Sequence, residues 1–242
     1  MLKEFVRRLL TFTPYRIVRH AENRFQASDH CLRHLGKRGY APRRILDGGA
    51  YDGAFALECH AIFPGARIDM IEPQFATRPT LEALARARGF AFHPQALTEQ
   101  RGTVRFYCNE VPDSGAHVAF ASDLPDDIVD VEGVALDDLF GARLDAGDRT
   151  LLKLDLQGWE LAVLKGGPVT LTRVEVLLIE VSFFKQNYEP SIPELVTFLD
   201  GAGFDLYDVG SLSGRTRDDR LRQGDLVFVR RGSPLLADDN WE

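Results

Sequence analysis

The sequence contains no long apolar segment and few cysteines, and both absences limit the classes of protein it can encode. No run of 18 apolar residues occurs in its 242 residues, so we expect no segment that spans a membrane. The three cysteines, Cys31, Cys59 and Cys108, are odd in number and form no Cys-x-x-Cys pair, which disfavours a disulfide framework. The apolar run at residues 9–12 is too short for the core of a signal peptide. These observations predict a cytoplasmic protein.

Positive charge is scarce over most of the chain and abundant at its start. Residues 1–44 hold 11 Lys and Arg against 3 Asp and Glu, whereas the whole chain has a formal net charge of −7. Such a basic segment could touch a membrane surface, the acidic body of the chain or a partner subunit. Because it lacks interleaved aromatic residues that could stack on bases, we expect no nucleic-acid partner. We predict that residues 1–42 form a helical arm, a lid or a dimer element, which allows a homodimer.

The chain is organised around residues 44–53, Arg-Ile-Leu-Asp-Gly-Gly-Ala-Tyr-Asp-Gly. An apolar pair precedes Asp47, and apolar residues at helical spacing follow Gly53, so the stretch predicts a strand, a glycine turn and a helix. Asp52 stands where an N-cap is expected. The glycines let the backbone turn tightly and approach a ligand closely, although such a turn can also serve packing alone.

The nicotinamide fingerprint G-x-G-x-x-G is absent from this turn, and residues 45–66 contain no Lys or Arg. A bound pyrophosphate would therefore depend on the helix N-terminus alone. Asp47 can instead hold an amino group, while Gly49 and Gly53 admit the ribose and carboxylate ends of a nucleoside. This combination suits a cationic ligand without phosphate, which describes S-adenosylmethionine.

A second acidic residue, Glu72, ends the short apolar segment at residues 68–72, 19 residues after Gly53. Nucleoside-binding α/β folds place an acid at about this distance, where it accepts hydrogen bonds from ribose hydroxyls. Pro73 cannot donate to a sheet, so the strand is expected to stop there. The spacing therefore predicts that Glu72 binds the cofactor ribose.

A third stretch, residues 151–160, combines a leucine-rich strand with Asp155 at its carboxyl end. Lys153 shares the side-chain direction of Asp155, and an unpaired charge in such a strand is unfavourable. The next apolar strand, at residues 174–182, is interrupted by Glu180 near its end. Because α/β sheets place ligand chemistry at the carboxyl ends of their strands, we predict that Asp155 and Glu180 are catalytic. A structural ion pair with Lys153 is the alternative.

Helices and strands alternate through most of the remaining sequence. The patterns predict helices at residues 20–35, 79–88 and 191–202, the last with a Ser191–Glu194 capping box, and strands at 90–97, 103–109, 204–209 and 225–231. The acidic segment at 113–130 could line a pocket or hold a metal, although a solvated loop is the default. His30 and His34 have a spacing that zinc can use, but no acid-rich partner lies nearby, so we expect no metal.

Four segments resemble the FkbM-like family of S-adenosylmethionine-dependent methyltransferases. The signature block is residues 152–167, Leu-Lys-Leu-Asp-Leu-Gln-Gly-Trp-Glu-Leu-Ala-Val-Leu-Lys-Gly-Gly, and residues 45–53, 134–139 and 179–181 also resemble the family pattern. The resemblance runs in order from about residue 43 to 230. It implies an α/β fold with a Rossmann-like, seven-stranded, mostly parallel sheet and an antiparallel last strand, forming a class I methyltransferase domain over residues 43–242.

The resemblance also implies O-methylation of a hydroxyl on a sugar or secondary metabolite, so the expected partner is a small-molecule or glycan acceptor. The family usually has Glu where Gln157 stands and commonly Asn where Tyr51 stands. The first departure removes an acid beside the transfer site and argues against a metal. The residues we expect to hold S-adenosylmethionine are Asp47, Gly48, Gly49, Ala50, Tyr51, Gly53, Glu72, Pro73, Gln74, Ala96 and Asp155.

Two alternative functions follow from the same residues. A dinucleotide-dependent oxidoreductase could use the same fold, and a non-catalytic relative could retain the cofactor, with Gln157 as the sign of lost chemistry. If the enzyme is a methyltransferase, the activated methyl donor leaves the protein to align the acceptor and to supply a general base. His93 and His117 are alternative bases to Asp155 and Glu180.

Overall fold

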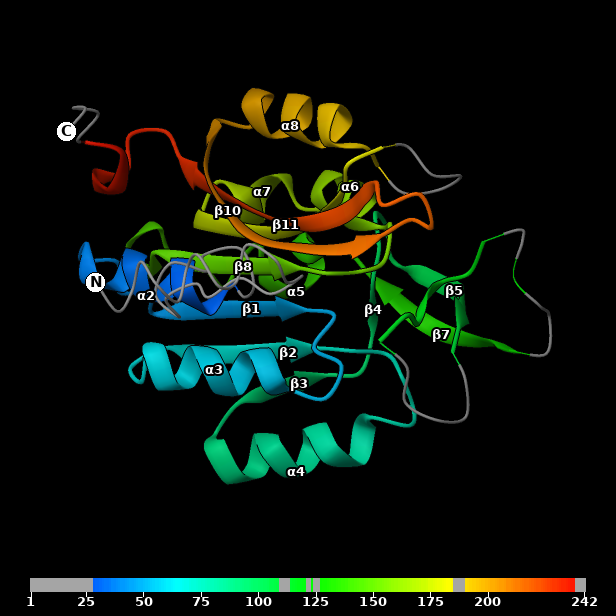
Figure 1. The fold of residues 1–242 in the computed structure, drawn as a ribbon. Helices are drawn as coiled ribbons and strands as arrows, with labels where there is room; N and C mark the ends of the chain where they lie inside the picture. Colours follow the sequence, from blue (N-terminus) through cyan, green and yellow to red (C-terminus); the bar gives the residue numbers. More distant parts are fainter. Residues whose placement is uncertain (1–27, 109–113, 121–122, 124–126, 185–189, 238–242) are drawn as a thin grey trace, which may run out of the picture.

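A seven-stranded sheet forms the centre of the computed structural model, which describes residues 28–108, 114–120, 123, 127–184 and 190–237. The strand order is β10-β11-β9-β8-β1-β2-β3 (Figure 1). Neighbouring pairs are parallel from β9 to β3, and only β11, the last strand in the chain, runs against the others. The predicted mostly parallel sheet with an antiparallel last strand is therefore confirmed. Its strands are β1 (Arg44–Gly48), β2 (Arg67–Ile71), β3 (Ala91–His93), β8 (Thr150–Leu154), β9 (Val174–Ser182), β10 (Phe204–Arg215) and β11 (Leu221–Arg230).

Helices cover both faces of this sheet, which explains why its central strands are apolar throughout rather than alternating. All five residues of β8 are buried. On one face the core is completed by Phe140 of α5, Val163 of α6, Leu171 of α7 and Leu195 of α8. The bounds of these helices are α5 (Leu136–Phe140), α6 (Glu160–Lys165), α7 (Pro168–Leu171) and α8 (Ile192–Gly201).

The opposite face is covered by α2 (Asp29–Lys37), α3 (Ala54–Ile62) and α4 (Arg78–Arg88). Each contributes a fully buried residue, Leu35, Ala56 and Leu81 respectively. The helix predicted at residues 20–35 begins at Asp29 in the described chain and runs through Gly36 to Lys37. Residues 1–27 of the predicted arm lie outside the described residues, and its described helix packs as part of the main core.

A second, four-stranded sheet lies beyond the carboxyl ends of β1 and β2, where their arrowheads point in Figure 1. Its order is β4-β7-β5-β6, with strands β4 (Ala96–Leu97), β5 (Gly102–Tyr107), β6 (His117–Val118) and β7 (Ile128–Val134). The single strand predicted at 90–97 is therefore wrong, because it divides into β3 and β4. Pro94, which has no N–H to donate, stands at the division. The strand predicted at 103–109 belongs to this second sheet.

Two further elements follow from local sequence. The predicted capping box is present at the start of α8, where the Ser191 N–H donates to Glu194 Oε2 at 2.9 Å. Short 3-10 helices occur at Ala146–Asp148 and Pro234–Leu236.

In the part of the chain that the structure describes, no helix has both the length and the apolar character needed to cross a membrane.

Candidate active site

The strand register brings the three predicted segments to one edge of the main sheet. Gly48 of β1 pairs with Ile71 of β2 on one side and with Leu154 of β8 on the other. The residues that follow these strand ends, including Glu72 and Asp155, therefore emerge side by side. They line a pocket of about 260 Å³. This arrangement agrees with the expectation from sequence that ligand chemistry lies at the carboxyl ends of the strands.

Most of the predicted cofactor residues line this pocket, and some do not. The lining includes Gly49, Ala50, Tyr51, Glu72, Pro73, Gln74, Ala96 and Asp155. Asp47, Gly48, Gly53 and Glu180 are not among the lining residues. Sequence reasoning did not select Phe106, Val118, Trp159 or Asp225, which also line the pocket.

The glycine turn is held by contact between chain segments. Gly49 has φ +78°, and a Cβ at this position would lie 2.0 Å from the Asp155 carbonyl oxygen, so no other residue fits without moving the backbone. The N–H groups of Gly49 and Ala50 donate to the Ile71 carbonyl at 3.0 and 3.1 Å. Gly53, with φ +83°, is the N-cap of α3, and Asp52 accepts from the Ala54 N–H at 3.0 Å. The N-cap predicted at Asp52 is therefore one residue too early.

Tyr51 adopts a left-handed backbone conformation with φ +48°. Asn adopts this region more easily than other non-glycine residues, which gives a physical reason for the Asn that the family resemblance leads us to expect at this position. In this chain, Glu72 stabilises the turn: its Oε2 accepts from the Tyr51 N–H at 2.9 Å. The other oxygen, Oε1, accepts from the Gln74 N–H at 3.1 Å.

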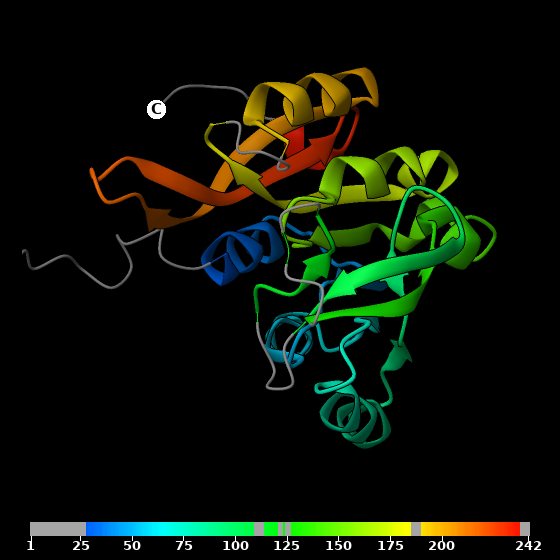
Figure 2. The same ribbon diagram turned by 90° about the vertical axis from the view of Figure 1, so that its right-hand side faces the viewer.

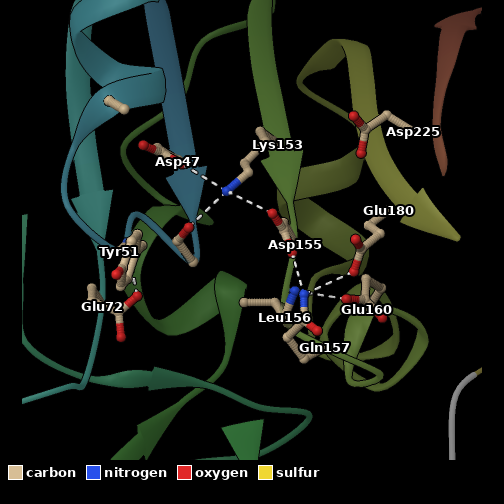
Figure 3. Close-up of polar contacts among 12 residues, drawn as sticks. Asp47, Tyr51, Glu72, Lys153, Asp155, Leu156, Gln157, Glu160, Glu180 and Asp225 are labelled. Carbon is tan, nitrogen blue, oxygen red and sulfur yellow. Dashed lines mark hydrogen bonds and ion pairs between the residues drawn. The ribbon is translucent and has the colours of Figure 1, made fainter. Parts of the chain in front are cut away.

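Glu72 is thus a buried carboxylate held at both oxygens by backbone donors (Figure 3). Burial raises the pKa of Glu72, and the hydrogen bonds from Gln74 and Tyr51 oppose that increase. Each carboxylate oxygen has a second lone pair, so Glu72 can still accept hydrogen bonds from a ligand in the pocket.

Lys153 joins the glycine turn to the end of β8. Its Nζ donates to the Gly49 carbonyl at 2.7 Å and lies 3.3 Å from Asp47 Oδ1 and 3.7 Å from Asp155 Oδ2. Burial lowers the pKa of Lys153, but the carboxylates of Asp47 and Asp155 outweigh it and the net pKa is raised. The alternative pairing of Lys153 with Asp155 is present, and the pair with fully buried Asp47 was not foreseen.

We expect Lys153→Met to destabilise the fold by about 3–5 kcal/mol, because it leaves the Asp47 carboxylate buried without its counter-charge. Urea unfolding measures this change. Adding Asp47→Asn should recover much of the loss, since the double variant no longer buries an isolated charge. Equal stability of Lys153→Met and the wild type would show that the pair is not structural.

Gln157 connects the two predicted catalytic carboxylates (Figure 3). Its Nε2 lies 2.9 Å from Asp155 Oδ1 and 3.0 Å from Glu180 Oε2. Burial raises the pKa of Glu180 to about 9, with further increases from Asp155, Glu160 and Asp225. Burial also raises the pKa of Glu160 to about 7, while the N–H of Leu156 donates to that carboxylate at 2.7 Å.

The histidines weighed as alternative bases are engaged elsewhere. His93 Nε2 lies 2.9 Å from Asp69 Oδ1. His117 Nδ1 lies 2.6 Å from the Gly115 carbonyl, and its Nε2 lies 3.1 Å from Asp123 Oδ2. Neither histidine lines the pocket. Across the described ranges, no group of three or more His, Cys, Asp and Glu side chains is arranged to hold a metal ion.

Residues of the second sheet, among them Phe106 and Val118, line one side of the pocket. Figure 2 shows this sheet on the side of the molecule that faces the viewer. Trp159 docks it to the main sheet, because its Nε1–H donates to the Val118 carbonyl at 2.9 Å. The Trp159 ring lies nearly parallel to that of Phe120, 8° between planes and 6.2 Å between centroids. This wall brings Phe106 and Val118 to the ligand space, which local sequence patterns do not reveal.

The topology and the site define a class I methyltransferase fold, in which a glycine turn follows the first strand and an acid ends the second. Residues 47–206 match the methyltransferase FkbM domain. The chain belongs to this family, and the resemblance read from its motifs is confirmed. Membership implies S-adenosylmethionine as the cofactor. No curated protein matches the chain.

Several solved structures are similar to this chain at low sequence identity. A methyltransferase FkbM from Methylobacillus flagellatus has 18% identity and a TM-score of 0.50, covering 78% of this chain and 43% of its own. The Burkholderia thailandensis 1,6-didemethyltoxoflavin-N1-methyltransferase has 14% identity and a TM-score of 0.45, covering 85% and 79%. Aeropyrum pernix fibrillarin has 15% identity and a TM-score of 0.43, covering 78% and 67%. The chain thus spans less than half of the FkbM relative from Methylobacillus.

Proposed function

We propose that this chain transfers a methyl group from S-adenosylmethionine to a hydroxyl of a sugar or secondary metabolite. The observation that carries the proposal is the pocket where the glycine turn, Glu72 and Asp155 meet at the strand ends. Asp155 lines this pocket with 38% of its side chain exposed, so a bound acceptor can reach it. S-adenosylmethionine supplies an already activated methyl group when bound.

The pocket residues fit a nucleoside that carries positive charge and no phosphate. Glu72 lines the pocket and keeps acceptor capacity for ribose hydroxyls beside its hydrogen bonds from Tyr51 and Gln74, and Gly49 brings backbone to the pocket wall without a side chain. Among the described residues that line the pocket, the single Lys or Arg is Lys153, and Asp47 and Asp155 already neutralise it. A pyrophosphate would find no available cation there. This charge pattern favours the methyltransferase over the dinucleotide-dependent oxidoreductase.

We assign the role of general base to Asp155. Lys153 Nζ lies 3.7 Å from Asp155 Oδ2, and Asp155 lines the pocket while Glu180 does not. Burial and its acidic neighbours raise the pKa of Glu180 to about 9, so this carboxyl group keeps its proton at neutral pH. Two carboxyl groups with different surroundings therefore take different roles, as in other acid–base sites. Glu180 therefore does not contact the acceptor and is linked to Asp155 through the Gln157 amide.

Asp47 is proposed to act on the cofactor side through Lys153, rather than by direct contact with the cofactor amino group. It is fully buried, and its Oδ1 lies 3.3 Å from Lys153 Nζ. Lys153 in turn donates to the Gly49 carbonyl, so the pair fixes the turn that faces the ligand. Because Asp47 does not line the pocket, its pairing with Lys153 supports this indirect role over the contact with the cofactor amino group that the sequence led us to expect.

Calorimetric titration with S-adenosylmethionine and with NAD tests the cofactor assignment directly. We expect binding of S-adenosylmethionine and no binding of NAD. Transfer of a radiolabelled methyl group to a panel of hydroxylated sugars, phenols and amines then tests the reaction. Label on amines alone would contradict O-methylation, and cofactor binding without transfer to any member would favour the non-catalytic alternative.

A further inference from the structure

The amide of Gln157 occupies the space between two carboxyl groups that come from different strands. Asp155 follows β8 and Glu180 lies near the end of β9, and Nε2 of Gln157 is 2.9 and 3.0 Å from their oxygens. An –NH2 group carries two hydrogens, so it can donate one to each carboxyl. Because both neighbours offer oxygen acceptors, the nitrogen end of the amide is the end that fits between them.

The backbone at Gln157 is fixed in an unusual conformation. Gln157 has φ +54° and Gly158 has φ +109°. A non-glycine residue in this region is strained and persists only when its surroundings impose it. The buried carboxylate of Glu160 imposes it here, accepting from the Leu156 N–H at 2.7 Å and from the Gly158 N–H at 3.2 Å. The turn therefore aims the Gln157 side chain at the two carboxyls.

The surroundings of the bridge are strongly acidic. Glu180 lies opposite Asp225 in the β9–β11 register, and its other oxygen accepts from Gln223. The charged or titratable groups that act on Glu180 and on Lys153 at the two ends of this cluster are Asp47, Asp155, Glu160 and Asp225. Within this cluster Lys153 is the single cation, and it lies on the far side of Asp155 from Glu180 (Figure 3).

We propose that Gln157 is a positioning residue that holds the Asp155 carboxylate toward the acceptor and separates it from Glu180. The proposal rests on the proposed function, in which Asp155 is the base. A Glu at this position would have no hydrogen to donate when ionised, and it would add a negative charge next to the Asp155 carboxylate. The Gln at 157 therefore marks a different way of ordering the site, and not lost chemistry.

The test compares Gln157→Glu and Gln157→Met with the wild type. All three side chains are unbranched and of similar length, so the left-handed backbone affects them alike. Met removes both hydrogen bonds without adding charge, and Glu replaces the donor by an acid. Turnover is followed as a function of pH, using whichever hydroxyl of the panel the wild type methylates.

We expect kcat to fall about 10- to 100-fold in both variants while the KM for S-adenosylmethionine stays within about twofold, because the base is misplaced and the cofactor site is intact. In Gln157→Glu the midpoint of the kcat–pH profile should also move up by about one unit or more, since a like charge disfavours ionisation of the base. Wild-type kcat and an unchanged profile in Gln157→Met would overturn the proposal, whether or not the Glu variant folds.

Thermal melting of the cofactor-free protein separates this proposal from the proposed function. A Glu introduced between acids has a raised folded-state pKa, so its contribution to stability is present below pH 4.5 and lost as pH rises. The melting temperature of Gln157→Glu should therefore fall further below that of the wild type at pH 9 than at pH 5. If the difference in melting temperature between the variant and the wild type were the same at both pH values, the proposed role of Gln157 would be refuted. If the difference grew with pH but the wild type transferred no methyl group, only the proposed methyl transfer would be refuted.

Discussion

Asp155→Asn is expected to lower turnover by about 10²–10⁴-fold, the usual range for loss of a general acid or base. The carboxylate lines the pocket and is held from two directions, by Lys153 at 3.7 Å and by Gln157 at 2.9 Å. Its negative charge is what allows it to accept the hydroxyl proton of an acceptor. An amide in the same place retains the shape and loses that ability.

The fold should survive this substitution, which makes the result interpretable. The side-chain oxygen of Asn can accept the same hydrogen bond from Gln157 that Asp155 Oδ1 accepts now. Lys153 keeps Asp47 at 3.3 Å and the Gly49 carbonyl at 2.7 Å, so its charge stays paired. We therefore expect cofactor affinity and melting temperature close to those of the wild type.

Initial rates of methyl transfer measure the effect, with Glu180→Gln as the matched comparison. The protonated Glu180 and a Gln in its place are both neutral, so that variant should lose much less activity than Asp155→Asn. Full activity in Asp155→Asn would contradict a catalytic role for Asp155. A larger loss of activity in Glu180→Gln would instead assign the role of general base to Glu180. We also expect activity to withstand chelators, because Gln157 stands where a further acid would help bind a metal.

Much of the site was predictable because parallel strands end at one edge. Asp47, Glu72 and Asp155 each follow an apolar run, and the sheet registers Gly48 between Ile71 and Leu154. Local patterns of this kind therefore place side chains that are far apart in sequence. The antiparallel last strand also agrees with the expectation that the family resemblance carried.

The contacts that the sequence did not disclose depend on register and on three-dimensional packing. Asp225 reaches the pocket because β11 pairs with β9 in an antiparallel register, which the chain order does not fix. Val118 and Trp159 meet because the second sheet folds over the strand ends. The local sequence at Gln157 suggests only that an acid has been lost. The distances from its Nε2 to Asp155 and Glu180 are needed to show that its amide bridges their carboxyl groups.

Removal of the Glu72 side chain should have the largest effect on cofactor binding. Its carboxylate anchors the turns at Tyr51 and Gln74, and by our proposal it accepts two hydrogen bonds from ribose. Hydrogen bonds to a charged group are each worth about 1.5–3 kcal/mol. Losing two of them predicts that Glu72→Ala weakens S-adenosylmethionine binding by about 10²–10⁴-fold.

Calorimetry should show this loss without general unfolding. Burial raises the pKa of Glu72 in the folded protein, so the group favours the folded state at low pH and disfavours it as pH rises through the folded-state pKa. Glu72→Ala removes that penalty at neutral pH, which offsets the loss of two backbone contacts. The melting temperature of the cofactor-free variant should therefore change little compared with the loss of affinity.

Two further variants make the Glu72 assignment specific. Glu72→Gln keeps the volume and one acceptor oxygen, so its affinity should lie between those of the wild type and Glu72→Ala. Glu82→Ala, on α4 and partly exposed beside Arg86, removes a carboxylate that does not line the pocket and should bind the cofactor normally. If Glu72→Ala bound S-adenosylmethionine as tightly as Glu82→Ala, the ribose would have to lie elsewhere in the pocket. The glycine turn would then be the remaining basis for cofactor recognition.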